Sequence, residues 1–232
     1  MGWSQSEIES LSPILGQLQA DLELLHEKSL LVLCSAAGQI AFWLAERMTG
    51  GHILGVELNE GLLQAARRSA SEKRLRLPVE FRRADKTRLL FPDNTFDGLI
   101  SEFIIFPTPT PTQIGQPEMA RVLKPGGRLV ITDVIVTTPV SPEARQAFQA
   151  IGLDYLCEGT ADDFRRWMHA AGIADVVVKD LTPVVRAVWE QRRKHDPAPD
   201  HRVGYSLLLE DSPLALGEGI FYLYVRGTKP PA

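Results

Sequence analysis

The sequence predicts an α/β fold built on a doubly wound, mostly parallel sheet. Short apolar runs, which are typical of buried strands, alternate along the chain with segments of helical periodicity. Such alternation implies parallel strands joined by helical crossovers. The chain has 232 residues, of which 44% are hydrophobic and 23% charged. This is enough for one large α/β domain with a core of its own.

The segment before the first strand is predicted to be helical. Apolar residues recur there at spacings of three and four, while Pro13 divides the pattern and Ser12 is placed to cap its second part. The apolar positions are Ile8, Leu11, Leu15, Leu18, Leu22 and Leu25. The pattern fits either a helix that packs on its own domain or the seam of a homodimer. We expect the first, because so few heptads are short for a seam.

The first half of the core is predicted to hold four strands. They cover residues 30–34, 53–57, 79–84 and 96–101. A helix is expected after Gly38, ending near the glycines at 50–51, and a second helix is expected to be capped by Asn59 and to run to about Lys73.

The second half of the core continues the alternation. The predicted segments are a stiff proline-rich loop at 106–111, a helix at 118–123, a turn at 125–127, a strand at 128–136, a strand at 176–178, a helix at 183–195 and a last strand at 220–225. Between them, Thr160 and Asp163 are placed as a capping box for a helix that Gly172 ends. The last strand is apolar at nearly every position, so we expect it to be covered on both faces.

Composition and charge exclude several function classes. The 25 Lys and Arg residues against 29 Asp and Glu give a net charge of -4, whereas nucleic-acid-binding surfaces are usually basic. Two cysteines, Cys34 and Cys157, cannot form a disulfide framework. The longest uncharged stretch, 29–45, is short for a membrane span, and no signal peptide is apparent. We therefore expect a cytoplasmic protein that binds neither nucleic acid nor membrane.

The candidate binding site lies where the predicted parallel strands end. In an open parallel sheet, ligands bind beyond the carboxyl ends of the strands, beside the start of the first helix and the tip of the second strand. The segment 34–38 and Glu57 hold those two places, and Glu57 follows Gly38 by 19 residues. A carboxylate there can accept hydrogen bonds from both hydroxyls of a ribose. Because dinucleotide and S-adenosylmethionine sites share this arrangement, it leaves the cofactor open.

Two segments are more specific. Phe-Pro-Asp-Asn-Thr-Phe-Asp stands at 91–97 before the fourth strand, and Glu118 precedes Ala-Arg-Val-Leu-Lys-Pro-Gly-Gly-Arg at 120–128. Here the chain resembles the class I S-adenosylmethionine-dependent methyltransferases over residues 30–181. The similarity is to their small-molecule branch, which includes ubiquinone/menaquinone-biosynthesis and arsenite methyltransferases. The resemblance implies a Rossmann-like sheet with an antiparallel last strand, and S-adenosylmethionine as the cofactor.

The resemblance also implies which residues bind the cofactor. They are Cys34, Ala36, Gly38, Glu57, Leu58, Asp85, Lys86, Ser101 and Glu102. Glu57 would bind the ribose, Asp85 would lie near the adenine amino group, and Ser101 with Glu102 would face the donor methyl. Three alternatives stay open: Asp85 caps local backbone, Gly38 only starts a helix, and Glu102 only orders the strand end. No catalytic residue is assigned.

The first motif departs from the family. Methyltransferases of this class usually carry an acidic residue and then Gly-x-Gly-x-Gly, whereas this chain has Val32 and then Cys-Ser-Ala-Ala-Gly at 34–38. A positive φ at Ala36 would cost on the order of 1 kcal/mol or more, and its methyl group occupies space near a cofactor. The departure keeps an alternative open, in which the fold binds a nucleoside-type ligand or a protein partner without turnover.

The sequence thus predicts methyl transfer by direct displacement to a small-molecule acceptor, within one domain over 1–232. Residues 1–28 would form a helical roof, 29–181 the core, and 182–232 a further roof segment with the last strand. A nicotinamide-dependent dehydrogenase is disfavoured, because the loop at 34–38 lacks Gly-x-Gly-x-x-Gly. No metal is expected, since the loop from His195 to His201 lacks ligand spacing. Arsenite is disfavoured as acceptor, because binding trivalent arsenic would take three thiolates.

Overall fold

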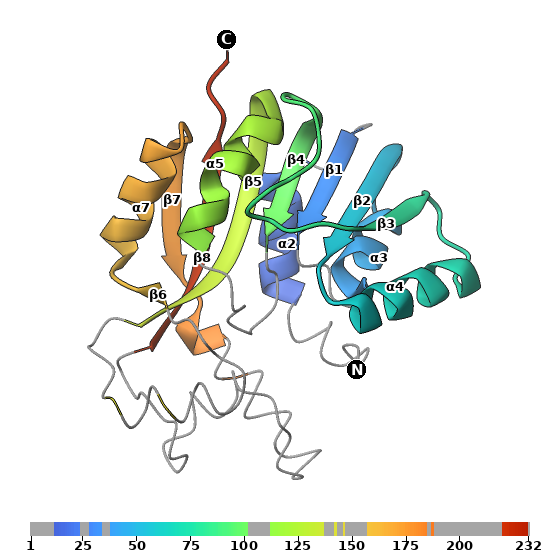
Figure 1. Ribbon diagram of the computed structural model, residues 1–232, viewed down its shortest axis with the longest axis horizontal. Helices are drawn as coiled ribbons and strands as arrows, with labels where there is room; N and C mark the ends of the chain where they lie inside the picture. Colours follow the sequence, from blue (N-terminus) through green and yellow to red (C-terminus); the bar gives the residue numbers. More distant parts are fainter. Residues whose placement is uncertain are drawn as a thin grey trace.

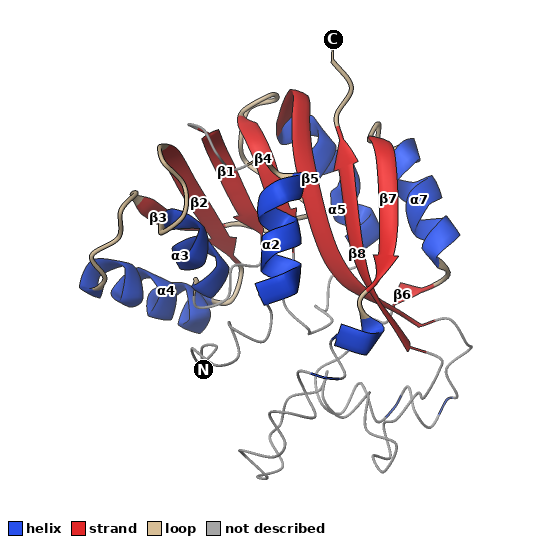
Figure 2. Cartoon of the chain, turned by 180° about the vertical axis from the view of Figure 1, so that it is seen from behind, coloured by secondary structure: helices blue, strands red, loops and turns tan. Residues whose placement is uncertain are grey.

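The computed structural model describes residues 12–23, 28–33, 38–101, 112–136, 157–184 and 220–231, together with 142, 146 and 187. These residues form one sheet with helices on both faces (Figures 1 and 2). The strands are β1 Lys28–Leu33, β2 Gly51–Glu57, β3 Val79–Arg83, β4 Phe96–Ser101, β5 Leu123–Val136, β6 Cys157–Glu158, β7 Ala174–Asp180 and β8 Ile220–Thr228. The helices are α2 Ser12–Asp21, α3 Gln39–Ala45, α4 Glu60–Glu72, α5 Thr112–Val122 and α7 Ala161–Ala170.

The sheet has the order β3-β2-β1-β4-β5-β8-β7, and β6 pairs with β5. All strand pairs from β3 to β5 are parallel, whereas β8 runs antiparallel to both of its neighbours, β5 and β7. The chain order reverses between β1 and β4, which is the switch point of a doubly wound sheet. The predicted fold class is confirmed, including the antiparallel last strand.

Alternation along β1 divides the core into two layers, because successive side chains of a strand point to opposite faces. Leu30 and Val32 pack with α2, α3 and α4 on one face, whereas Leu31 and Leu33 pack with α5 and α7 on the other. Figure 2 shows α2 in front of the sheet with α5 and α7 behind it. Burial on both faces explains why the strands read as continuous apolar runs.

Helix α2 packs on the sheet of its own chain, as predicted. Leu15 and Leu18 of α2, and Leu22 directly after the helix, are buried in the same cluster as Leu30 and Val130. Burying a leucine side chain stabilises a fold by about 1.5–3 kcal/mol, so α2 is an integral part of the core. The roof predicted for 1–28 and 182–232 lies largely outside the described residues and stays a prediction.

Three local predictions are confirmed in atomic detail. The Asn59 side chain accepts a hydrogen bond from Leu62 N and caps α4. Thr160 and Asp163 form a reciprocal capping box at the start of α7. In β8, residues 222–225 are all buried, as expected of a strand covered on both faces.

Two elements begin at least five residues earlier than predicted. Helix α5 starts at Thr112 rather than Glu118, with Pro117 inside it, and β5 starts at Leu123 rather than Arg128. The predicted turn at 125–127 lies within β5, where Gly126 has a φ of +76°. Its backbone is held by Lys229, which accepts from Gly126 N at 2.8 Å and donates to Gly127 O at 2.9 Å. The predicted loops at 106–111 and 195–201 and most of the predicted helix at 183–195 lie outside the described residues.

Helices in the described part of the chain are all too short or too polar to cross a membrane.

Candidate functional site

Four of the parallel strands end at one edge of the sheet, which we call the carboxyl edge. Leu33 pairs with Val56 of β2 and with Ser101 of β4, and Glu57 pairs with Arg83 of β3. The arrowheads of β1, β2 and β4 point to this lower edge in Figure 1. The predicted site residues Gly38, Glu57, Leu58, Asp85, Lys86 and Ser101 all belong to these strand ends or to the segments that follow them. Cys34, Ala36 and Glu102 lie outside the described residues.

The Glu57 carboxylate is held at the tip of β2. Its side chain is only 9% exposed. Oε1 accepts hydrogen bonds from Leu58 N at 2.9 Å and Asn59 N at 3.0 Å. These backbone donors belong to the turn into α4, so the turn orients the carboxylate at the switch-point edge. The adjacent Leu58 is half exposed and offers an apolar surface there.

Asp85 makes the local contacts of a capping residue. Its Oδ1 accepts from both the backbone N and the Oγ1 of Thr87, each at 2.8 Å. The sequence left open that Asp85 only caps local backbone, and the hydrogen bonds with Thr87 are of that kind. Since only Oδ1 makes these contacts, a ligand contact through Oδ2 is compatible with them. Lys86, the next residue, is buried.

Gly38 begins α3 in a conformation that favours glycine. Its φ is +91°, and a Cβ at this position would lie 2.6 Å from Phe81 Cζ and 2.8 Å from Phe42 Cζ. These two rings pack edge to face with centroids 5.6 Å apart. The helix-start role predicted for Gly38 is thus present, and contact with a ligand stays a prediction.

Two buried polar atoms have no hydrogen-bond partner. Among the described residues, only Ser101 Oγ and Gln116 Nε2 are in this condition. Ser101 ends β4 at the carboxyl edge and is 0% exposed, while Gln116 lies in α5 and is 1% exposed. An unsatisfied buried polar group costs about 1–3 kcal/mol of folding free energy. A bound ligand that hydrogen-bonds to Ser101 Oγ or Gln116 Nε2 would offset this cost. Sequence reasoning selected Ser101 and missed Gln116.

The two motif segments meet at the opposite edge, where β4 and β5 begin; we call it the amino edge. The Arg121 guanidinium contacts Glu118 at 2.8 Å, Asp93 at 2.7 Å, and the carbonyl oxygens of Phe91 at 2.7 Å and Leu89 at 2.6 Å. The hydrogen bonds that Arg121 donates to Glu118 and Asp93 raise the pKa of Arg121 above its ordinary value. These motif residues join the segment before β4 to α5, and their role is structural.

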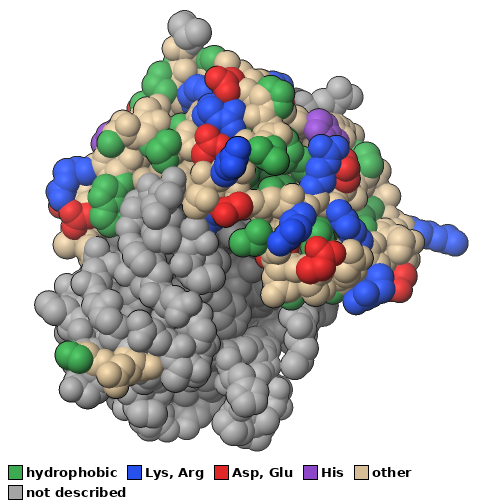
Figure 3. All heavy atoms as spheres, in the orientation of Figure 1, with side chains coloured by type: hydrophobic (Ala, Val, Ile, Leu, Met, Phe, Trp, Pro, Cys, Tyr) green, Lys and Arg blue, Asp and Glu red, His purple; other side chains and the backbone are tan. Residues whose placement is uncertain are grey.

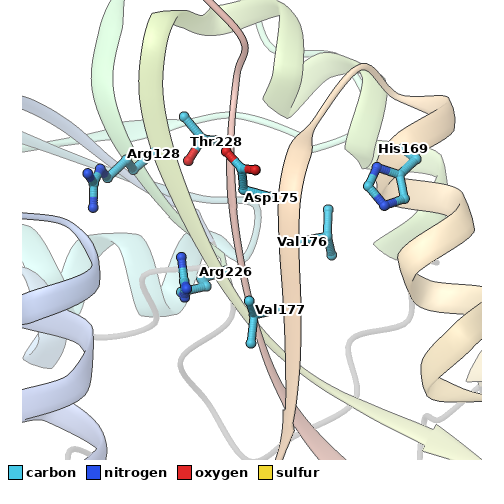
Figure 4. A pocket seen from close by; sticks show the side chains of 7 residues that line it. All are labelled: Arg128, His169, Asp175, Val176, Val177, Arg226 and Thr228. Carbon is cyan, nitrogen blue, oxygen red and sulfur yellow. The ribbon is translucent and has the colours of Figure 1, made fainter.

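An open groove is lined by residues of β5, β7, β8 and α7 (Figure 4). It has a volume of about 630 Å³, and its lining includes Arg128, Arg226 and Thr228. Arg128 forms an ion pair with Glu23, and Arg226 approaches Asp21 at 3.6 Å. Because acidic residues at the end of α2 already balance both cations, the groove does not compete with the carboxyl edge as a candidate site.

Charged side chains of both signs intermingle on the described part of the face in Figure 3. Within the described ranges, no three His, Cys, Asp or Glu side chains are placed to hold a metal ion.

Comparison with known proteins gives consistent matches. Residues 31–131 match the family of methyltransferase domains. The chain is 29% identical over 209 residues to a demethylmenaquinone methyltransferase of Clavibacter sepedonicus, covering 80% of this chain and 77% of the relative. It is 36% identical over 124 residues to a 2-phytyl-1,4-naphtoquinone methyltransferase of Synechococcus elongatus, covering 53% of this chain and 51% of the relative. The chain thus spans about half the length of this second relative.

Solved structures share the fold at low sequence identity. A geranyl diphosphate C-methyltransferase from Streptomyces coelicolor superposes with a TM-score of 0.74 at 17% identity, covering 98% of this chain and 86% of that one. A cyclase named SpnF superposes with a TM-score of 0.72 at 22% identity, covering 95% and 82%. Together the matches confirm the predicted resemblance.

Proposed function

We propose that this chain, in which residues 31–131 match the family of methyltransferase domains, transfers a methyl group from S-adenosylmethionine to a small-molecule acceptor. The domain bears out the enzyme class predicted from the sequence. The observation that carries the site is the carboxyl edge itself. The Glu57 carboxylate, held by backbone donors, stands at the end of β2, and the buried Ser101 hydroxyl, which has no hydrogen-bond partner, stands at the end of β4, on the other side of β1.

The residues at this edge fit a nucleoside cofactor. Glu57 has acceptor oxygens that suit the two hydroxyls of a ribose, and charge-assisted hydrogen bonds of that kind are the stronger ones. Leu58 presents an apolar surface directly beside it, which suits the face of a base. Ser101 Oγ lies buried without a partner at the end of β4, so a bound ligand would satisfy it.

The chemistry asks more for positioning than for acid or base groups. When bound, S-adenosylmethionine would supply a sulfonium methyl group: a nucleophilic atom of the acceptor would bond to the methyl carbon as its bond to sulfur breaks, and S-adenosylhomocysteine would leave. Holding two reactants in line contributes much of the rate in such a reaction. The strand ends would provide that by fixing the cofactor against a rigid sheet. The names of the relatives make naphthoquinone-type compounds the first acceptors to test.

The test is calorimetric titration of S-adenosylhomocysteine into the parent protein, Glu57→Ala and Glu57→Gln. Loss of the charged acceptor should weaken binding by roughly 10- to 150-fold, since hydrogen bonds to charged groups contribute about 1.5–3 kcal/mol. Glu57→Gln keeps an acceptor for the backbone of the turn, so it separates loss of charge from loss of local structure. Glu60→Ala, at an exposed position in the first turn of α4, is the matched control and should bind as the parent does.

Two outcomes would overturn the proposal. If the parent does not bind, and Ala36→Gly restores nothing, the non-catalytic alternative replaces methyl transfer. If Glu57→Ala binds as tightly as the parent, the ligand sits away from the carboxyl edge.

A further inference from the structure

We infer that Gln116 is a further cofactor-binding residue, whose side-chain amide donates a hydrogen bond to a ring nitrogen of the bound purine. The inference rests on the proposed function, because it needs a nucleoside cofactor at the carboxyl edge. It adds a residue from α5 to a site otherwise made of strand ends and the segments that follow them.

The first observation is the state of the Gln116 side chain. It is 1% exposed, and its Nε2 has no hydrogen-bond partner. Met119 and Ala120 follow at the helical spacings of three and four and are buried in the cluster beneath α5. Gln116 therefore occupies the stripe of α5 that faces the sheet, where an apolar side chain would satisfy the packing. An amide donor at such a position is costly unless something accepts from it.

The second observation is where α5 carries this residue. The helix connects β4 to β5, so it begins near the carboxyl edge and returns to the amino edge. Gln116 lies in its second turn, toward the carboxyl edge. A Cβ on the preceding Gly115 would lie 3.1 Å from the carbonyl oxygen of Lys86. The absence of a side chain at Gly115 thus lets α5 pass close beside the segment at 85–86, which the resemblance to the methyltransferases implies to lie near the adenine.

The chemistry of the two groups is complementary. The amino group of adenine is a donor, which suits the Asp85 carboxylate, whereas the unsubstituted ring nitrogens of a purine are acceptors. The Gln116 amide offers the donor that such a nitrogen requires. The two side chains would then recognise adenine by a donor and an acceptor at once.

The test uses Gln116→Leu, which replaces the amide by an apolar side chain of similar size. S-adenosylhomocysteine should bind this variant about 3- to 10-fold more weakly, the range for one neutral hydrogen bond. The melting temperature should stay the same or rise, because removing an unpaired buried amide costs the fold nothing. Gln116→Met serves if leucine fits poorly, and Gln64→Leu, at a half-buried position of α4, is the matched control.

Deaza analogues locate the contact. We expect one of the 1-deaza, 3-deaza and 7-deaza analogues of S-adenosylhomocysteine to bind the parent about 3- to 10-fold more weakly than the natural ligand does. The same analogue should bind Gln116→Leu as tightly as the natural ligand binds that variant. Such non-additivity assigns the Gln116 amide to the missing nitrogen.

Other results would overturn the inference. Equal losses for every analogue in both proteins would show that Gln116 does not contact the base. A clear drop in the melting temperature of both Gln116→Leu and Gln116→Met would show that the amide is satisfied within the fold. If the parent binds S-adenosylhomocysteine and Gln116→Leu binds it equally well, only this inference fails. If the parent binds none, the proposed function fails with it.

Discussion

The amino and carboxyl edges of the parallel sheet differ in how their polar side chains are paired. At the amino edge, Asp97 accepts from Lys124 Nζ at 2.8 Å and from Ser29 N at 2.9 Å. Lys229 Nζ donates to Asn94 Oδ1 at 2.9 Å and to the carbonyl oxygen of Leu123 at 2.7 Å. The hydrogen bonds of Arg121 with Glu118, Asp93 and two backbone carbonyl oxygens lie at the same edge. The amino edge is thus internally satisfied.

The carboxyl edge is incomplete by comparison. The described residues there include the buried Ser101 hydroxyl, and α5 brings the Gln116 amide toward it, both without hydrogen-bond partners. Because unpaired buried groups lower stability, this edge is maintained at a cost that a ligand can offset. The amino edge therefore stabilises the fold, whereas the carboxyl edge has unpaired groups whose hydrogen bonds can contribute free energy to ligand binding.

The largest expected effect comes from breaking the amino edge with Arg121→Ala. The fold should lose about 3 kcal/mol, because hydrogen bonds to charged groups contribute about 1.5–3 kcal/mol each and several share one guanidinium. Urea denaturation measures the loss, and Arg165→Ala in an exposed ion pair should lose less than about 1 kcal/mol. S-adenosylhomocysteine affinity should change less than twofold in Arg121→Ala. A large loss of affinity would contradict the separation of the two edges.

A gain in stability is expected from Pro117→Ala. Proline inside a helix removes a hydrogen bond and clashes with the preceding turn, and Pro117 lies inside α5 directly after Gln116. The substitution should stabilise the fold by about 1–3 kcal/mol. Pro125→Ala, in the irregular start of β5, serves as the control and should lose up to about 1 kcal/mol through the unfolded state. An unchanged or lower stability in Pro117→Ala would show that α5 already accommodates the proline.

Acid should weaken the amino edge. The hydrogen bond from Arg121 lowers the pKa of Glu118 below its ordinary value of 4.5, and it outweighs the opposing effect of burial. A lowered folded-state pKa means that ionised Glu118 stabilises the fold above about pH 4.5, and that this contribution is lost as the pH falls through the folded pKa.

Glu118→Gln tests this by flattening the acid limb of the stability profile, by on the order of 1 kcal/mol after allowance for partial exposure. Urea denaturation from pH 7 down to pH 3 measures it. A variant whose profile parallels that of the parent would rule the carboxylate out as a source of the pH dependence.

The smallest change in stability is expected at the carboxyl edge. Ser101→Ala removes a hydroxyl that has no partner, so stability should be unchanged or rise by up to about 1 kcal/mol. S-adenosylhomocysteine affinity should fall about 3- to 10-fold, the range for one hydrogen bond. Thermal melting and calorimetry on one preparation give both numbers. A loss of stability with unchanged affinity would place Ser101 among the structural residues of the amino-edge kind.

Local signals in the sequence predicted most of the fold. The Asn59 cap, the capping box of Thr160 and Asp163, and the strand at 96–101 depend on neighbours within a few residues, and each is present. Errors arose where distant residues decide. The glycines at 126 and 127 form part of a strand because Lys229 pairs with them, which no local pattern indicates.

The candidate site was predictable to the same extent. The position of Glu57 follows from the end of the second strand, whereas Ser101 was predicted from the resemblance to the methyltransferases. Gln116 was missed because Thr, Gly and Pro around it suggest a loop, and these residue types disfavour helix. One signal was available: Gln116 shares a helical stripe with Met119 and Ala120, and a polar residue on a buried stripe is informative.

Strand β8 comes after all other described strands in the chain, yet it lies between β5 and β7. During synthesis, β5 and β7 are therefore made before β8, the strand that pairs with both. Until β8 is made, each of them has an edge whose backbone groups lack their partner strand. Such edges are templates for pairing with other chains. The nascent protein is thus most prone to aggregation late in its synthesis, and a chaperone that shields β5 until β8 has emerged would protect the step that closes the sheet.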